Sequence, residues 1–341
     1  LERVLYMELF KYNLSEKIHL PVVLKDTFKN KNYCFLDIET TGLSSKYHKI
    51  ILIGLLCVED DNAYIVQFFA NHPSKENILL DQFADYLNKF EYIFTFNGLT
   101  FDIPFIKKRL ELHGITSNIE NLEHLDLLRT VRKYKSILNL ENCKLKSVEK
   151  SLGIYREDTI SGKESVELYN KYAFSNNKDL NIRDIILKHN YEDIYYLPKL
   201  LSIYDTIDKK NNLKISLTIK DINCTISISK DSIVSKRNKL CLSGHSPIIN
   251  IPYHLYYGES YVLDWDTSKG VFNFEINYQS GYISSGEKCF YIDLNLITKN
   301  LFKSNKLGHS IPDNILLLKV NDNIVYDNIE LLIRDVLDGL N

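Results

Sequence analysis

The sequence predicts an α/β fold, in which a mixed sheet flanked by helices is followed by a second, β-rich domain. Apolar runs at 33–36, 50–58 and 63–69 indicate strands, and a helical period follows at 76–90. A strand at 91–96 and a helix after residue 102 come next. This order implies a mixed sheet with helices packed on it. Beyond residue 212 apolar and polar residues alternate, which is the period of a half-buried strand.

A chain of 341 residues is expected to form about two domains. We expect a lead-in of undefined structure at 1–30, a first domain at 31–205, a polar linker at 206–212 and a second domain at 213–341. The first domain is expected to continue with a short strand at 124–128 and helices at 144–151, 163–172 and 179–207. The second is expected to begin with a hairpin, to continue with strands near 261–265, 271–278, 289–295, 315–320 and 324–326, and to end in a helix from Asp327.

Composition excludes several classes of protein. A hydrophobic content of 45% and a charged content of 25% are typical of a globular chain. The sequence has no apolar run long enough to span a membrane and no recognisable leader, so we expect no membrane association. Its six cysteines form no Cys-x-x-Cys pair, which argues against a zinc ribbon and favours the cytoplasm. The net charge of −2 does not itself indicate nucleic-acid binding.

The first motif, Asp-Ile-Glu-Thr-Thr-Gly-Leu, covers residues 37–43 and comes at the end of a predicted strand. Side chains two apart on a strand share a face, so Asp37 and Glu39 are expected to point the same way. The Thr-Thr-Gly that follows ends the strand and allows the backbone to approach a ligand. Alone, such a pair is an ordinary set of strand-end carboxylates.

Two further motifs supply acids later in the chain. Asn-Gly-Leu-Thr-Phe-Asp ends at Asp102, where a helical pattern begins, and His189 and Asp193 are four apart on a predicted helix, so they share one face. Separately, these residues are compatible with a helix cap, a structural histidine and a surface acid. Together the three motifs supply oxygen ligands that suit Mg²⁺ or Mn²⁺, and a pair of such ions is the usual means of cutting phosphodiesters.

These three motifs resemble those of the DEDD superfamily of 3′→5′ exonucleases, which have a ribonuclease H-like fold. Three more segments, 145–156, Ser161-Gly162 and 187–194, are similar to those of the YprB-type ribonuclease H-like proteins of bacteria. The similarity covers about residues 30–205. The better-studied branches have a His five residues before the last Asp or a Tyr four before it, whereas here His189 is four before Asp193.

The resemblance implies a metal-dependent 3′→5′ exonuclease that acts on DNA or RNA, with a single-stranded 3′ end as the expected partner. It implies two Mg²⁺ or Mn²⁺ ions held by four ligands: Asp37, Glu39, Asp102 and Asp193. His189 would be the general base. The expected contacts to the terminal nucleotide are Thr40, Thr41, Gly42, Leu43, Asn97 and Phe101.

Several alternatives stay open from the sequence. Asp126 is either a further site residue or a polar strand end. The basic residues near 107–109, 129–135 and 144–156 are compatible with phosphate contacts and equally with solvated helix faces. A non-catalytic nucleic-acid-binding or scaffold protein, or a structure-specific endonuclease, would fit the same fold. The sequence identifies no protein partner.

Overall fold

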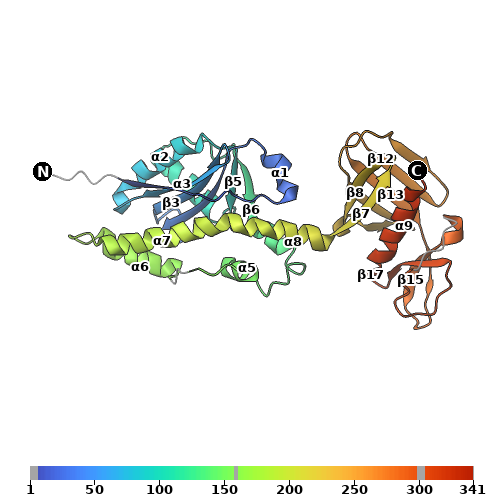
Figure 1. Ribbon diagram of the computed structural model, residues 1–341. Helices are drawn as coiled ribbons and strands as arrows, with labels where there is room; N and C mark the ends of the chain where they lie inside the picture. Colours follow the sequence, from blue (N-terminus) through green and yellow to red (C-terminus); the bar gives the residue numbers. More distant parts are fainter. Residues whose placement is uncertain (1–6, 157–159, 298–303, 341) are drawn as a thin grey trace. The chain divides into compact units, whose positions relative to one another are not determined.

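The computed structural model describes residues 7–156, 160–297 and 304–340. The chain divides into two compact units, Leu1–Asp208 and Lys209–Asn341, drawn in Figure 1. Each unit has hydrophobic clusters of its own. Among the described residues, no helix is both long and apolar enough to cross a membrane.

The first unit is built on a six-stranded mixed sheet with the order β1-β4-β3-β2-β5-β6. Strands β2, β3 and β4 form an antiparallel meander, and β1 pairs antiparallel with β4 at one edge. Strands β5 and β6 extend the sheet in parallel with β2. The strand bounds are Glu8–Asn13 (β1), Tyr33–Thr40 (β2), Ile50–Glu59 (β3), Asn62–Phe69 (β4), Tyr92–Thr95 (β5) and Glu123–Asp126 (β6). The predicted mixed sheet is therefore confirmed.

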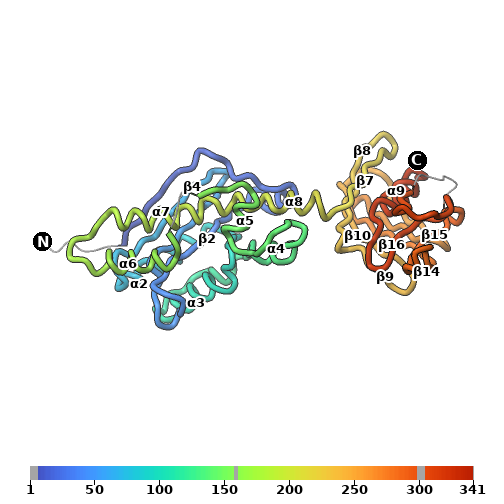
Figure 2. The backbone as a smooth tube through the Cα atoms, turned by 90° about the horizontal axis from the view of Figure 1, so that it is seen from below, coloured from blue at the N-terminus to red at the C-terminus, as the bar shows by residue number. Residues whose placement is uncertain are grey.

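Helices cover both faces of this sheet. Helices α2 (Glu76–Leu87) and α3 (Asp102–His113) lie on one face, while α6 (Gly162–Ala173) and α7 (Leu180–Tyr196) lie on the other (Figure 1). Seen from below, α6 runs beside α7 (Figure 2). Both faces are apolar, since alternate residues of β2 enter different hydrophobic clusters. The remaining elements are α1 (Val22–Phe28), the 3₁₀ turn η1 (Pro73–Lys75), α4 (Leu127–Lys133) and α5 (Leu145–Ser151).

Local caps decide where the long helices begin. Ser161 and Glu164 form a capping box at the start of α6, and the Asp179 side chain accepts from Asn181 N at the start of α7. The predicted helix at 179–207 is divided, because α7 passes into the 3₁₀ helix η2 (Leu197–Leu201), which contains Pro198, before α8 (Ser202–Asn211) begins.

Two segments differ from the expected organisation. The residues expected as a polar linker at 206–212 continue α8 as far as Asn211, and Asn212 begins the next strand. The helix forms because Ile203 and Ile207 are buried in a core cluster of the first unit. The lead-in at 1–30 contains β1 and α1.

The second unit is β-rich, as predicted. A seven-stranded antiparallel sheet has the order β11-β12-β13-β10-β8-β7 with β9 paired to β10, and a four-stranded sheet has the order β14-β15-β16-β17. The predicted C-terminal helix is α9 (Tyr326–Asp338), which buries its apolar face in the core. Strands β9, β10, β11 and β14 were not anticipated. The bounds are Asn212–Ile219 (β7), Ile222–Ser229 (β8), Val234–Lys236 (β9), Lys239–His245 (β10), His254–Tyr257 (β11), Tyr261–Asp266 (β12), Val271–Asn277 (β13), Gln279–Tyr282 (β14), Lys288–Asp293 (β15), Ile315–Val320 (β16) and Asn323–Ile324 (β17), with 3₁₀ turns at Lys230–Ser232 (η3) and Leu294–Leu296 (η4).

Candidate metal and catalytic site

Strand β2 carries two acids on the face that α7 covers. Leu36 and Ile38 enter the core beneath α2 and α3, whereas Phe35 enters the core beside α7. The pleat therefore turns Asp37 and Glu39, which alternate with Ile38, towards α7. Glu39 is buried, and its Oε2 accepts a hydrogen bond from Ser165 Oγ of α6 at 3.1 Å.

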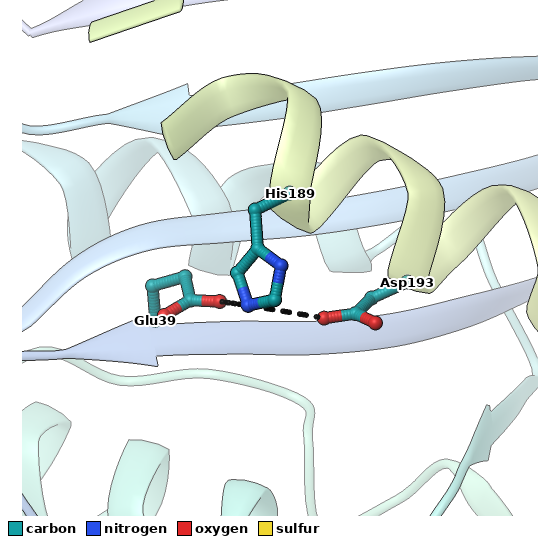
Figure 3. A group of neighbouring side chains, drawn as sticks. All are labelled: Glu39, His189 and Asp193. Carbon is teal, nitrogen blue, oxygen red and sulfur yellow. Dashed lines mark ion pairs between the residues drawn. The ribbon is translucent and has the colours of Figure 1, made fainter. Parts of the chain in front are cut away.

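Helix α7 brings an imidazole and a third acid against this strand. His189 Nε2 lies 3.4 Å from Glu39 Oε1 and 3.7 Å from Asp193 Oδ2 (Figure 3). One ligand atom from each of these three residues lies within 4.8 Å of the others, which is close enough for one metal ion. The four-residue helical spacing of His189 and Asp193 thus produces the predicted shared face.

The fourth acid, Asp102, reaches the site from the N-terminus of α3. Its Oδ1 accepts a hydrogen bond from Ile38 N at 3.3 Å, so it meets β2 between the two strand acids. Asp37 lies on the same side as Asn190 of α7, whose Nδ2 donates to Asp37 Oδ2 at 2.9 Å. Three segments that are distant in sequence therefore converge on one acidic centre.

Electrostatics show that this centre is short of positive charge. Burial, and then the charges of Asp193, Asp102 and Glu39, raises the pKa of Asp37 well above its usual range. Burial raises the pKa of Glu39 to about 7, against the opposing effect of His189. Burial also raises the pKa of Asp102 to about 7, although backbone hydrogen bonds lower it. Because the donor set is rich in carboxylate oxygen, these residues fit a hard divalent cation such as Mg²⁺ or Mn²⁺.

One cation from the protein is already bound to this centre. Arg156 donates to Asp193 Oδ1 and to Glu149, and its side chain is 5% exposed. Arg156, one of the basic residues noted as possible phosphate contacts, is therefore held by carboxylates. Sequence reasoning missed its role, as well as those of Ser165 and Asn190. Asn190 lies within the third motif, so its position beside His189 was a usable signal, whereas Ser165 carried none.

A cavity of 910 Å³ opens beside the centre, within the range of about 300–1,000 Å³ that is typical of ligand pockets. Glu39, His189 and Asp193 line it, together with four of the expected substrate contacts: Thr40, Gly42, Leu43 and Phe101. Gly42 lets the His48 ring pack closely, since a Cβ there would lie 2.5 Å from that ring. Leu43 is 86% exposed at the mouth.

The other two expected contacts, Thr41 and Asn97, are engaged in turns. Thr41 exchanges hydrogen bonds with Lys49 across the β2–β3 turn, through its backbone N–H and its hydroxyl oxygen. Asn97 has φ of 73° and its Oδ1 accepts from Thr100 Oγ1 at 2.7 Å. Asp126 caps α4 and accepts from Asn97 N at 2.8 Å and Leu99 N at 3.1 Å. Asp126 thus serves as the polar end of β6 and anchors the turn that leads to Asp102.

A family model described as the RNase_H superfamily matches residues 34–204, which is half of the chain. This chain belongs to the RNase_H superfamily. The matched region contains β2, the start of α3 and all of α7, and so it contains all four carboxylates. The first unit is therefore a ribonuclease H-like domain, with the β-rich unit following it.

Comparison with solved structures returns distant likenesses to this RNase_H superfamily chain. The family B DNA polymerase of the hyperthermophilic archaeon Pyrobaculum calidifontis is 16% identical with a TM-score of 0.42, over 52% of this chain and 24% of the polymerase. Exonuclease I of E. coli in complex with a dT13 oligonucleotide is 11% identical with a TM-score of 0.33, over 62% of this chain and 55% of that one. The match thus spans about a quarter to half of those proteins. Comparison with curated proteins finds none that matches.

Proposed function

We propose that this protein is a metal-dependent 3′→5′ exonuclease that hydrolyses phosphodiester bonds of DNA or RNA with two Mg²⁺ or Mn²⁺ ions. The observation that carries the proposal is the meeting of acids from β2, α3 and α7 beside one cavity. Asp37, Glu39 and Asp102 have raised pKa values, caused first by burial and then in part by neighbouring carboxylates, and a bound cation would offset both effects. Membership of the RNase_H superfamily supports the same chemistry.

Each group has a role in this proposal. Asp37, Glu39, Asp102 and Asp193 would hold the ions, which when bound would acidify the attacking water and stabilise the leaving oxygen. His189 accepts the proton of that water, and its contacts with Glu39 and Asp193 hold the ring at the edge of the centre. Arg156 orients Asp193 through a direct ion pair.

The 910 Å³ cavity is proposed to bind the 3′ end of the nucleic acid. Thr40, Gly42, Leu43 and Phe101 would contact the terminal nucleotide, whereas Thr41 and Asn97 would shape the turns that carry these contacts. Lys144, Lys146 and Lys163 also line the cavity and would attract phosphates of a single-stranded 3′ end. The resemblance to the DEDD superfamily contributes the 3′→5′ direction to this proposal, and the resemblance to YprB-type proteins contributes the bacterial origin. The cytoplasmic location follows from the scattered cysteines.

The second unit is assigned substrate or partner selection. It carries none of the motif acids and has its own hydrophobic core, so we propose that it contributes no group to the chemistry. Of the aromatic residues in this unit, Trp265 and Phe272 are fully buried, whereas Tyr257 is 75% exposed. Exposed tyrosines of this kind are the ones that can stack on bases.

The test is a Mn²⁺-dependent digestion of end-labelled single-stranded and duplex DNA and RNA. We expect a 5′ label to yield a ladder of shortening products and a 3′ label to be released at once as a mononucleotide. The Asp37→Asn variant is the control and should be inactive. Cleavage of a circular single strand would indicate an endonuclease instead. A gel shift without cleavage at any Mn²⁺ concentration would indicate a binding or scaffold protein and would overturn the proposal.

A further inference from the structure

A row of three residues crosses the centre of the first sheet beside the acidic centre. Asp37 of β2 lies opposite Gly54 of β3, and Gly54 lies opposite Gln67 of β4. Asn190 of α7 lies over Gly54, since a Cβ at Gly54 would be 2.2 Å from Asn190 Oδ1. The missing side chain at Gly54 therefore leaves space that Asn190 occupies together with Ile194, whose Cδ1 would lie 1.8 Å from such a Cβ.

Asn190 connects the two ends of this row by hydrogen bonds. Its Nδ2 donates to Asp37 Oδ2 at 2.9 Å and approaches the Asp37 carbonyl oxygen at 3.4 Å. Its Oδ1 accepts from Gln67 Nε2 at 2.9 Å, and the same Nε2 donates to Leu187 O, also at 2.9 Å. The orientation of both amides follows from Leu187 O, which can only accept, so that the amide nitrogen of Gln67 must face it. The same nitrogen faces Asn190, and the Asn190 atom that accepts from it must therefore be Oδ1.

The arrangement is costly and would not be expected for packing alone. Asn190 and Gln67 are both fully buried, and burying an amide costs free energy unless all of its groups are paired. Gln67 Oε1 has no hydrogen-bond partner among the described residues. An apolar pair would fill the same space between β4 and α7 without this cost. The amide pair therefore needs a function that apolar residues cannot supply.

We propose that Asn190, oriented by Gln67 and accommodated by Gly54, is a positioning residue that holds the Asp37 carboxylate in the orientation required to bind a divalent cation. The inference rests on the proposed function, because it takes Asp37 as a metal ligand. Donation from Asn190 occupies Asp37 Oδ2 from the side of α7 and so fixes the plane of the carboxylate.

The experiment measures the dissociation constant of Mn²⁺ by calorimetry, with the full chain and no nucleic acid. In Asn190→Ala we expect Mn²⁺ to bind about 10–100-fold more weakly, as is typical when a partner of a metal ligand is removed. In Gln67→Met, which keeps Asn190 and Asp37 in place, we expect a smaller loss in the same direction. The oligonucleotide KM should stay near the wild-type value while kcat falls.

Tyr169→Phe is the matched control. It also removes one buried hydrogen bond in the first unit, from the Tyr169 hydroxyl to Ala70 O at 2.7 Å. We expect a lower melting temperature and unchanged Mn²⁺ affinity. If Asn190→Ala and Gln67→Met behave like this control, the amide pair only ties α7 to the sheet, and the inference is overturned. A wild-type protein that binds no Mn²⁺ would overturn the proposed metal chemistry and this inference with it.

Discussion

At the residue scale the four carboxylates are not equivalent. Asp193 forms an ion pair with buried Arg156, whereas Asp37 has neutral Asn190 as its partner and three acids as neighbours. Relief of the repulsion between carboxylates would by itself leave the stability without metal unchanged or higher when either acid is removed. The ion pair with Arg156 changes that expectation for Asp193, because its loss leaves a buried guanidinium with Glu149 alone.

Asp37→Asn should abolish cleavage while the melting temperature in EDTA holds or rises. Asparagine mimics the neutral acid and relieves the repulsion between carboxylates. Asp193→Asn should also abolish cleavage, but should lower the metal-free stability by about 1.5–3 kcal/mol, the scale of a hydrogen bond to a charged group. Denaturation of both variants in EDTA measures this. Equal changes in stability for the two variants would show that the ion pair between Arg156 and Asp193 does not stabilise the fold.

The metal-free protein should lose stability as the pH rises through about 7. Glu39 and Asp102 have folded-state pKa values of about 7, whereas unfolded carboxyls titrate near about 4. The folded state therefore binds protons that the unfolded chain has released, so the stability these groups contribute is present at low pH and lost as they ionise. Chemical denaturation in EDTA at pH 6 and pH 8 tests this, and Glu39→Gln should flatten the difference. With Mn²⁺ the trend should reverse, because ionised acids bind the ion. A pH-independent stability in EDTA would contradict the prediction.

His189→Ala should slow cleavage by about 10²–10⁴-fold, the usual contribution of a general base. The residual rate should recover partly at higher pH, and Mn²⁺ affinity should be unaltered. Tyr191, two residues after His189, is the competing candidate for the general base. Tyr191→Phe should remain near wild type, because the Tyr191 ring packs against Tyr12 and Tyr195, with centroids 5.3 and 5.8 Å away. Cleavage rates of both variants, measured across pH, decide which residue is the general base. A His189 variant with the wild-type rate beside a Tyr191 variant with a strongly reduced rate would transfer the role to Tyr191.

At the scale of elements, a buried ion network ties α2 and α3 to the β2–β3 turn. Glu76 of α2 accepts from Ile50 N at 2.8 Å and forms a bidentate pair with Arg109 of α3. Arg109 also donates to Ser45 O at 3.2 Å, and His113 Nε2 lies 2.9 Å from Glu76 Oε2. The network therefore holds the turn whose first residues line the 910 Å³ cavity.

Arg109→Ala should lower the stability of the first unit by about 3–5 kcal/mol, because it leaves Glu76 buried without its main partner. Lys108→Ala is the control on the same helix. Its pair with Glu111 is exposed, and its removal should change stability by less than about 1 kcal/mol. Denaturation followed by circular dichroism measures both. The only tryptophan, Trp265, lies in the second unit, so its fluorescence reports that unit separately. An Arg109 variant as stable as the Lys108 variant would contradict the prediction.

At the scale of the whole molecule, the division falls between Asp208 and Lys209. The four carboxylates, His189 and Arg156 all precede it. A chain ended near Tyr204, as the expected linker suggested, would lack Ile207, which is buried in a core cluster of the first unit. A chain shortened to the first unit should therefore end after Ile207.

A chain ended at Asp208 should fold and retain metal-dependent cleavage of a short oligonucleotide, while losing substrate preference. The physical reason is that the first unit holds every proposed ligand and its own hydrophobic clusters. The rates of the full and truncated chains on short and long substrates measure this. A truncated chain that is well folded but inactive on the short substrate would show that the second unit completes the site.

Local periodicity was enough to determine much of this protein. The two-residue period placed Asp37 and Glu39 on one face, the four-residue spacing placed His189 beside Asp193, and the order of strands and helices predicted the mixed sheet. These features depend on neighbours along the chain, which the sequence displays directly. The same holds for the alternation that predicted a β-rich second domain.

Tertiary structure alone decided which distant groups meet. Arg156 and Asp193 form an ion pair across 37 positions, Gln67 and Asn190 bond across 123, and Arg109 reaches Glu76 across 33. No local period encodes such pairs, because they depend on the register of α7 on the sheet and on the space left at Gly54. The helical segment at 206–211 was missed for the same reason, since a polar stretch becomes helical when its one apolar residue, Ile207, is buried in a core that other elements build.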